Sequence, residues 1–213
     1  MAMMSMAYEE RLSRELQWAL REGSMHFEEK SAVHRTLQRI TLRLGELKIP
    51  YAVAGAMALF YHGFRRFTED VDILITRDGL DRLHHHLEGL GYLPAFPGSK
   101  TLRDAASGVR IEFLVSGEFP GDGKPKPVAF PDPQQAGIEK DGVRWLNLHS
   151  LVELKLASGM THPGRLKDLA DVQELIRALD LPADFSSQLQ PFVQEQYAKL
   201  WRAVKGSPSG LSG

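Results

Sequence analysis

The sequence of 213 residues contains no cysteine. Disulfide bonds, thiolate zinc sites and cysteine nucleophiles are therefore excluded, so any catalytic or metal-binding group must offer oxygen or nitrogen. The chain also has no large excess of positive or negative charge. Its 26 Lys and Arg residues and 27 Asp and Glu residues give a formal net charge of −1. No global field would draw such a chain onto nucleic acid or an anionic membrane, and a nucleic-acid partner would need a local basic patch.

Long hydrophobic runs are missing as well. No apolar stretch approaches the roughly 18 to 20 residues that span a bilayer, and the N-terminus lacks the continuous apolar region of a signal peptide. We therefore expect no membrane partner and a cytoplasmic location. Hydrophobic residues make up 43% and charged residues 25% of the chain, which is ordinary for a globular protein with one buried core.

The apolar pattern predicts an α+β fold with a small mixed sheet backed by helices and helical additions at both ends. We expect an N-terminal helical extension over 1–30, a core over 31–148, a C-terminal helical segment over 149–205 and a flexible tail over 206–213. The predicted strands are 51–54, 70–75 and 109–115. Helices are predicted over 33–48, 56–62, 80–90, from a capping box at 150–153, over 166–179 and over 184–203, whereas 117–142 is predicted as a loop-rich connection.

The strand over 70–75 carries two carboxylates on one side. Val71, Ile73 and Ile75 share one face, so Asp70 and Asp72 project together from the other. Two rigidly held carboxylates are suited to Mg²⁺, with Mn²⁺ as an acceptable substitute. Asp70 and Asp72 are therefore candidate metal ligands and catalytic residues.

Glu112 has the corresponding facing on the strand over 109–115. On a neighbouring strand it would supply a third metal ligand, and it could orient or deprotonate an attacking hydroxyl. The alternative is an ordinary surface ion pair, for instance with Arg110.

Gly55 stands between a predicted strand and a predicted helix. A glycine lets the backbone approach a ligand closely, and the N–H groups at the start of the following helix can bind phosphate oxygens. Fifteen positions separate Gly55 from Asp70, which leaves room for a short helix and a return loop. The two features can therefore meet at one edge of the sheet.

These residues resemble the nucleotidyltransferases of the DNA polymerase β-like superfamily, whose signature is Gly-Gly or Gly-Ser, a helix, and Asp-x-Asp or Asp-x-Glu. The stretch Arg66-x-Thr68-x-Asp70-x-Asp72 is similar to the branch of the AbiEii-type toxins of abortive-infection and toxin–antitoxin systems. Lys155-Leu-Ala-Ser and Arg165-Leu-Lys-Asp168 are similar to later motifs of that branch. The resemblance covers roughly 31–180 through few specific positions.

The resemblance implies a magnesium-dependent transfer of a nucleoside monophosphate from an NTP. The acceptor stays open between an RNA 3′ end, a protein hydroxyl and a small molecule such as an aminoglycoside. It also implies that Gly55, Ala56, Arg66, Thr68 and Lys155 bind nucleotide. By the same resemblance, Lys155 contacts phosphate or activates the acceptor, Asp168 orients it, and a toxin–antitoxin partner protein is an option.

Ala56 departs from the family pattern because it lacks the hydroxyl of the usual Ser, so a phosphate would depend on backbone N–H groups. This departure leaves open a non-catalytic binding or regulatory protein of the same fold, and a carboxylate-dependent nuclease is a third reading. Two site residues also have ordinary explanations. Lys155 could lay its stem along apolar surface with its ammonium in water, and Asp168 and Asp171 could belong to helix surface pairs with Arg165.

Two further charged groups have explanations that need no binding site. Three consecutive helical residues, His84 to His86, cannot converge on one ion, so we expect an exposed polar face. Lys124, Lys126 and Lys140 fit a surface loop as well as a nucleic-acid patch. Arg65 and Arg66 are better placed for phosphate contact.

Overall fold

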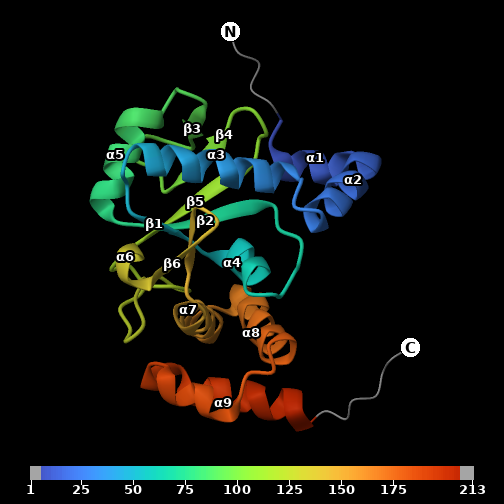
Figure 1. The fold of residues 1–213 in the computed structure, drawn as a ribbon, viewed down its shortest axis with the longest axis vertical. Helices are drawn as coiled ribbons and strands as arrows, with labels where there is room; N and C mark the ends of the chain where they lie inside the picture. Colours follow the sequence, from blue (N-terminus) through green and yellow to red (C-terminus); the bar gives the residue numbers. More distant parts are fainter. Residues whose placement is uncertain (1–5, 207–213) are drawn as a thin grey trace.

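The computed structural model describes residues 6–206, which build a mixed sheet with helices on both faces (Figure 1). The strand order is β3-β4-β5-β2-β1-β7-β6. The strands are β1 (Tyr51–Val53), β2 (Asp70–Ile75), β3 (Tyr92–Pro94), β4 (Thr101–Asp104), β5 (Arg110–Val115), β6 (Gly137–Lys140) and β7 (Val143–Leu146). The α-helices are α1 (Tyr8–Arg14), α2 (Leu16–Phe27), α3 (Ala32–Glu46), α4 (Gly55–Tyr61), α5 (Arg77–Leu87), α6 (Pro133–Ala136), α7 (Leu148–Thr161), α8 (Leu166–Ala178) and α9 (Pro191–Gly206), with 3₁₀ turns η1 (Pro163–Arg165) and η2 (Ala183–Gln188).

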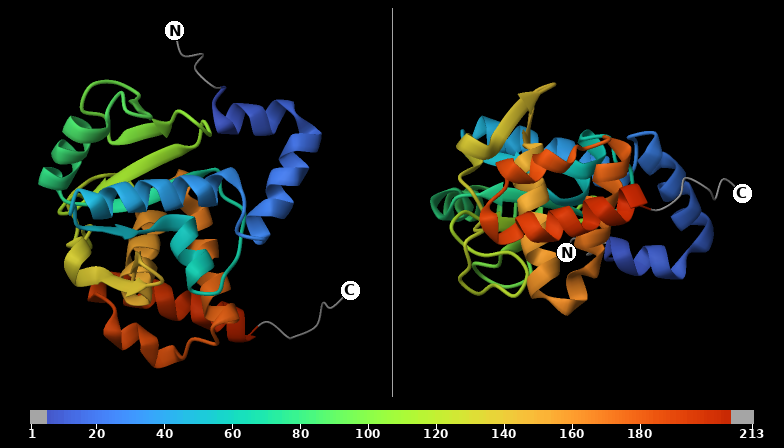
Figure 2. Two further views of the ribbon diagram at one scale, coloured as in Figure 1. Left: turned by 45° about the horizontal axis from the view of Figure 1, so that its top comes forward. Right: turned by 90° about the horizontal axis from the view of Figure 1, so that it is seen from below.

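The central strand β2 runs antiparallel to β1 and parallel to β5. Its alternation divides the core in two, because successive side chains of a strand point to opposite faces. Val71, Ile73 and Ile75 pack in the cluster that includes residues of α3 and α5, whereas Leu74 packs with residues of α4, α7, α8 and α9. The views in Figure 2 agree with this arrangement of helices on either side of the sheet. The predicted facing of Asp70 and Asp72, on the side of Leu74, is confirmed.

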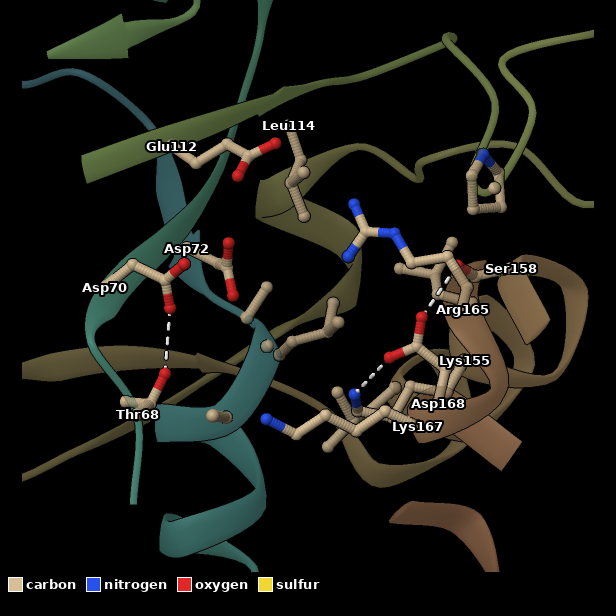
Figure 3. A pocket seen from close by; sticks show the side chains of 18 of the residues that line it. Thr68, Asp70, Asp72, Glu112, Leu114, Lys155, Ser158, Arg165, Lys167 and Asp168 are labelled. Atoms are coloured by element: carbon tan, nitrogen blue, oxygen red, sulfur yellow. Dashed lines mark hydrogen bonds and ion pairs between the residues drawn. The ribbon is translucent and has the colours of Figure 1, made fainter. Parts of the chain in front are cut away.

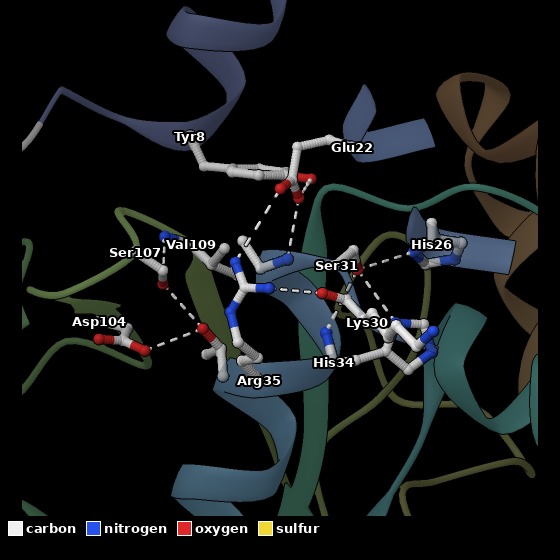
Figure 4. Close-up of polar contacts among 12 residues, drawn as sticks. Tyr8, Glu22, His26, Lys30, Ser31, His34, Arg35, Asp104, Ser107 and Val109 are labelled. Carbon is white, nitrogen blue, oxygen red and sulfur yellow. Dashed lines mark hydrogen bonds and ion pairs between the residues drawn. The ribbon is translucent and has the colours of Figure 1, made fainter. Parts of the chain in front are cut away.

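The hairpin of α1 and α2 is tied to the rest of the protein through buried polar contacts (Figure 4). The Tyr8 hydroxyl donates to Glu22 Oε2 at 3.1 Å, and the Ala32 N–H at the start of α3 donates to the same oxygen at 2.8 Å. The Tyr8 N–H donates to the Gly108 carbonyl at 3.1 Å. Tyr8 has no exposed surface and belongs to the core cluster of α3.

The segment over 117–142 is not entirely a loop. It ends in α6 and β6, and β6 pairs antiparallel with β7, a strand that was not predicted. Asp141 and Gly142 join the two strands with φ of 53° and 74°. Both left-handed values are what a tight hairpin turn requires, and an Asp-Gly pair is its usual sequence signal.

Three predicted helix boundaries are wrong. Helix α7 begins at Leu148, because the Asn147 side chain accepts the Ser150 N–H and caps it there. The final helix is interrupted after η2 and starts again at Pro191, since proline is accommodated in the first turn of a helix but not in its interior. Helix α5 ends at Leu87 rather than at the predicted residue 90, and Leu90 beyond it is 71% exposed.

Within residues 6–206, none of the helices combines the length and apolarity needed to cross a bilayer. Apart from Gly206, the predicted tail over 206–213 lies outside the described residues.

Candidate active site

All of the site residues expected from the sequence line one pocket, which has a volume of about 590 Å³. They come from the start of α4, from the segment before β2, from β2 and β5, and from α7 and α8 (Figure 3). They are Gly55, Ala56, Arg66, Thr68, Asp70, Asp72, Glu112, Lys155 and Asp168.

The three predicted carboxylates form a cluster on adjacent strands. Asp72 on β2 lies in register with Glu112 on β5, so both side chains leave the same face of the sheet. One oxygen from each of Asp70, Asp72 and Glu112 lies within 4.8 Å of the others. The spacing and the oxygen donors fit a divalent cation such as Mg²⁺.

Two partners fix the Asp70 carboxylate. The Thr68 hydroxyl donates to Oδ1 at 2.8 Å, and Arg110 donates to Oδ2 at 2.6 Å. The ordinary alternative for Glu112, an ion pair with Arg110, is therefore wrong, because Arg110 uses the carboxylate across the strand pair instead. Sequence reasoning missed this contact, whose signal was the facing that Arg110 shares with Glu112.

Asp72 is partly buried, as are Asp70 and Glu112. Burial, together with the negative charges of Asp70 and Glu112, raises the pKa of Asp72 to about 7, against the opposing charges of Lys155 and Arg165. A bound cation would favour the ionised carboxylate and reverse the direction of this shift.

Both the backbone conformation and the neighbouring atoms at position 55 require a glycine. Its φ is 57°, and a Cβ at this position would lie 1.7 Å from Asp72 Oδ2. The start of α4 therefore approaches the carboxylate cluster as closely as the backbone allows. No side chain caps the first turn of α4, and Ala56 contributes no hydroxyl there.

A buried ionic network forms another wall of the pocket. Lys155 donates to Asp168 at 2.9 Å and to Asp171 at 2.7 Å, and Arg66 donates to both oxygens of Asp171 at 2.8 and 3.0 Å. The Ser158 hydroxyl also donates to Asp168 at 2.7 Å. Burial acts to raise the pKa of Asp168, but Lys155 beside it holds that pKa below its ordinary value.

This network overturns two ordinary readings. Lys155 is only 6% exposed, so its ammonium does not reach into water, and Asp171 is 3% exposed rather than a member of a helix surface pair. Arg66 reaches the pocket, whereas Arg65 is turned toward Glu29 at 3.8 Å and does not line it. Among the remaining charged groups, His85 and His86 are exposed as expected, whereas His84 is partly buried beside Glu88 and the Ser99 carbonyl. The Lys126 side chain is only 6% exposed and donates to Asp122 and to the Pro120 carbonyl.

The sheet order, the helices on both faces and the carboxylate cluster define the class of architecture, which is the α+β nucleotidyltransferase fold expected from the sequence. Comparison with models of known families and with curated proteins gives no match.

Several solved structures have a similar fold. The solution structure of the antibiotic-resistance factor ANT(2″)-Ia matches with a TM-score of 0.52 and 16% identity, over 81% of this chain and 97% of that one. A crystal structure of ANT(2″)-Ia in complex with adenylyl-2″-tobramycin has a TM-score of 0.49 at 15% identity, covering 80% and 96% of the two chains. JHP933 from Helicobacter pylori has a TM-score of 0.47 at 15% identity, covering 81% and 89%.

Proposed function

We propose that this protein is a nucleotidyltransferase that moves a nucleoside monophosphate from an NTP to an acceptor hydroxyl. The observation that carries the proposal is the meeting of Asp70, Asp72 and Glu112 with the start of α4 in one pocket. A carboxylate cluster and a helix start whose N–H groups no side chain caps are two elements that suit a magnesium–triphosphate complex.

Asp70, Asp72 and Glu112 would hold Mg²⁺, with Mn²⁺ as an acceptable substitute. A cation bound there supplies charge neutralisation for the triphosphate. Thr68 and Arg110 keep Asp70 in place, and Gly55 leaves room for Asp72 beside the start of α4. The chain thereby positions its ligands before any nucleotide arrives, which lowers the cost of ordering them.

In the proposed reaction, the acceptor oxygen forms a bond to the α-phosphorus. The bond from that phosphorus to the bridging oxygen breaks, and its electron pair leaves with pyrophosphate. The acceptor proton passes to the Glu112 carboxylate. Lys155 has three N–H donors, two of which are used by Asp168 and Asp171, so one is available to a phosphate or acceptor oxygen.

Ala56 favours one alternative function, a non-catalytic protein of the same fold that binds nucleotide without turnover. The missing hydroxyl removes one phosphate contact, whereas the intact carboxylate cluster supports catalysis. A place in a toxin–antitoxin pair follows only from the resemblance of the sequence motifs. That role would require a partner gene product that suppresses toxicity when the two are expressed together.

The test is incubation with each α-³²P-labelled NTP, Mg²⁺ and a panel of acceptors, namely cell extract, purified RNA and tobramycin. Tobramycin is included because it is the adenylylated molecule in one neighbouring structure. Wild type should transfer label to one acceptor class, and the Asp70→Asn/Asp72→Asn double variant should not. Nucleotide binding by the wild type without any transfer would favour the non-catalytic alternative, and RNA cleavage without added NTP would identify a nuclease.

A further inference from the structure

The pocket contains more cations than its network of ion pairs uses. Lining cations are Arg66, Arg110, Lys155, Arg165 and Lys167. Arg66 and Lys155 are engaged by Asp171 and Asp168, and Arg110 is engaged by Asp70. Within residues 6–206, the side chains of Arg165 and Lys167 have no ion-pair partner among the contacts of the structure, and both residues are exposed.

The backbone that carries these two cations is held firmly. The Arg165 N–H donates to the His162 carbonyl at 2.9 Å, and the Gly164 N–H donates to His162 Nδ1 at 3.0 Å. Lys167 lies in the first turn of α8, whose Asp168 is anchored by Lys155 and Ser158. The segment is therefore fixed while its two cationic side chains are left unpaired.

Their direction is visible in Figure 3. The Arg165 guanidinium extends across the pocket toward the side of Asp72 and Glu112, and the Lys167 ammonium extends toward the beginning of α4. The positive charge of Arg165 is also felt at Asp72, where it opposes the rise of that pKa. The two cations thus face the region between the carboxylate cluster and the start of α4.

We propose that Arg165 and Lys167 bind the β- and γ-phosphates of the NTP and hold the pyrophosphate as it leaves, whereas Arg66 and Lys155 are fixed by Asp171 and Asp168. This inference rests on the proposed nucleotidyl transfer. The leaving group gains negative charge when the bond to the α-phosphorus breaks, and two unpaired cations placed there offset it. Arg66 has little remaining capacity for this role, because its guanidinium already donates to Asp171 and to the Phe67 carbonyl.

The test is isothermal titration with inorganic triphosphate and Mg²⁺, which needs no knowledge of the base or the acceptor. The Arg165→Ala/Lys167→Ala variant should bind triphosphate about 10- to 100-fold more weakly than wild type, the range expected for lost charge-assisted hydrogen bonds. Lys199→Ala/Arg202→Ala is the matched control, since it removes the same charge from exposed positions of α9 that do not line the pocket. The control should bind as wild type does.

Two further measurements separate the possible failures. Arg165→Lys/Lys167→Arg keeps both charges and should recover most of the affinity. Equal affinity of wild type and the double alanine variant would overturn the phosphate role of these cations while leaving nucleotidyl transfer standing. Absence of triphosphate and NTP binding by the wild type, with Mg²⁺ present, would overturn both proposals. Because both residues are exposed, the alanine variant should keep the wild-type melting temperature, which confirms that it folds.

Discussion

Gly55 and Asp72 lie in contact, and the site depends on what the glycine lacks. The left-handed φ of 57° excludes most side chains, and the Asp72 carboxylate fills the space where a Cβ would stand. Two separate physical reasons therefore require glycine at this one position.

We expect Gly55→Ala to lower the free energy of unfolding by more than the roughly 1–2 kcal/mol that left-handed backbone alone costs a residue with a Cβ. Gly89→Ala is the control, because Gly89 has a φ of 78° and no neighbouring atom within 4 Å of its Cβ position. Urea denaturation measures both. Equal losses in the two variants would show that the contact with Asp72 contributes nothing.

The raised pKa of Asp72 predicts that the stability of the fold depends on pH. Its pKa of about 7 in the folded protein lies above its ordinary value, so without a cation this group stabilises the fold in acid and loses that contribution as pH rises from about 4 through 7. A cation binds the ionised form, so its effect on stability should grow over the same range.

The increase in melting temperature caused by Mg²⁺ should therefore be larger at about pH 8 than at about pH 5.5. The comparison is made against Asp72→Asn, which should show little Mg²⁺ effect at either pH. The Asp72→Asn variant is needed because other titratable groups change the stability of the fold with pH in the opposite direction to Asp72. Burial lowers the pKa of His34 to about 4, for example, so the fold loses stability as pH falls below about 6.5. An Mg²⁺ effect that is equal at both pH values would contradict the prediction.

At the scale of elements, α7 and α8 are joined by the ionic network rather than by apolar contacts alone. Asp171 is its centre, because it receives both the Arg66 guanidinium and the Lys155 ammonium. The network also connects these helices to the segment before β2, where Arg66 precedes Thr68 and Asp70. The position of the carboxylate cluster relative to α8 therefore depends on Asp171.

Asp171→Asn should lower the free energy of unfolding by about 3–5 kcal/mol, because it leaves buried cations without their full countercharge. Asp180→Asn is the matched control. The Asp180 side chain is 85% exposed, and loss of its ion pair with Lys205 should have little effect. Denaturant melts of the two variants test the difference, and similar small losses would show that the network is not a structural anchor.

At the scale of the whole molecule, the described part of the predicted N-terminal extension, residues 6–30, contributes to the hydrophobic core. Tyr8 is fully buried with α3, and Glu22 joins Tyr8 to the Ala32 N–H. The N-terminal hairpin therefore supports the first face of the sheet, in the way that α9 supports the second.

Deletion of residues 1–30 should lower the melting temperature by about 10 °C or more, since loss of one buried aromatic side chain alone costs roughly 3–5 kcal/mol. Leu16→Ala is the control and should change it little, because Leu16 on α2 is 72% exposed. Differential scanning calorimetry compares the two proteins. An unchanged melting temperature in the deletion variant would show that the hairpin is dispensable for the fold.

The sequence by itself predicted the central strands, their facing and nine of the residues that line the candidate pocket. The apolar residues at every second position over 70–75 and 109–115 placed Asp70, Asp72 and Glu112 on the opposite side of their strands, because side-chain direction in a strand follows from its period of two. The turn at Gly55 was also local information. The short strands β3, β4, β6 and β7 were not predicted, and the clearest local signal of the β6–β7 hairpin is one Asp-Gly turn.

Only the tertiary structure decided which charges are used and which remain. From the sequence, Arg110 could have paired with Glu112. The pairing of β2 with β5 instead places Asp70 opposite Arg110, which donates to it. Lys155 and Asp171 are sixteen positions apart, and their burial together follows from the packing of α7 on α8. Ion-pair partners depend on distances between elements, which local periodicity does not specify. For this reason the sequence predicted residues that line the pocket, whereas only the tertiary structure showed that Arg165 and Lys167 have no ion-pair partner within residues 6–206.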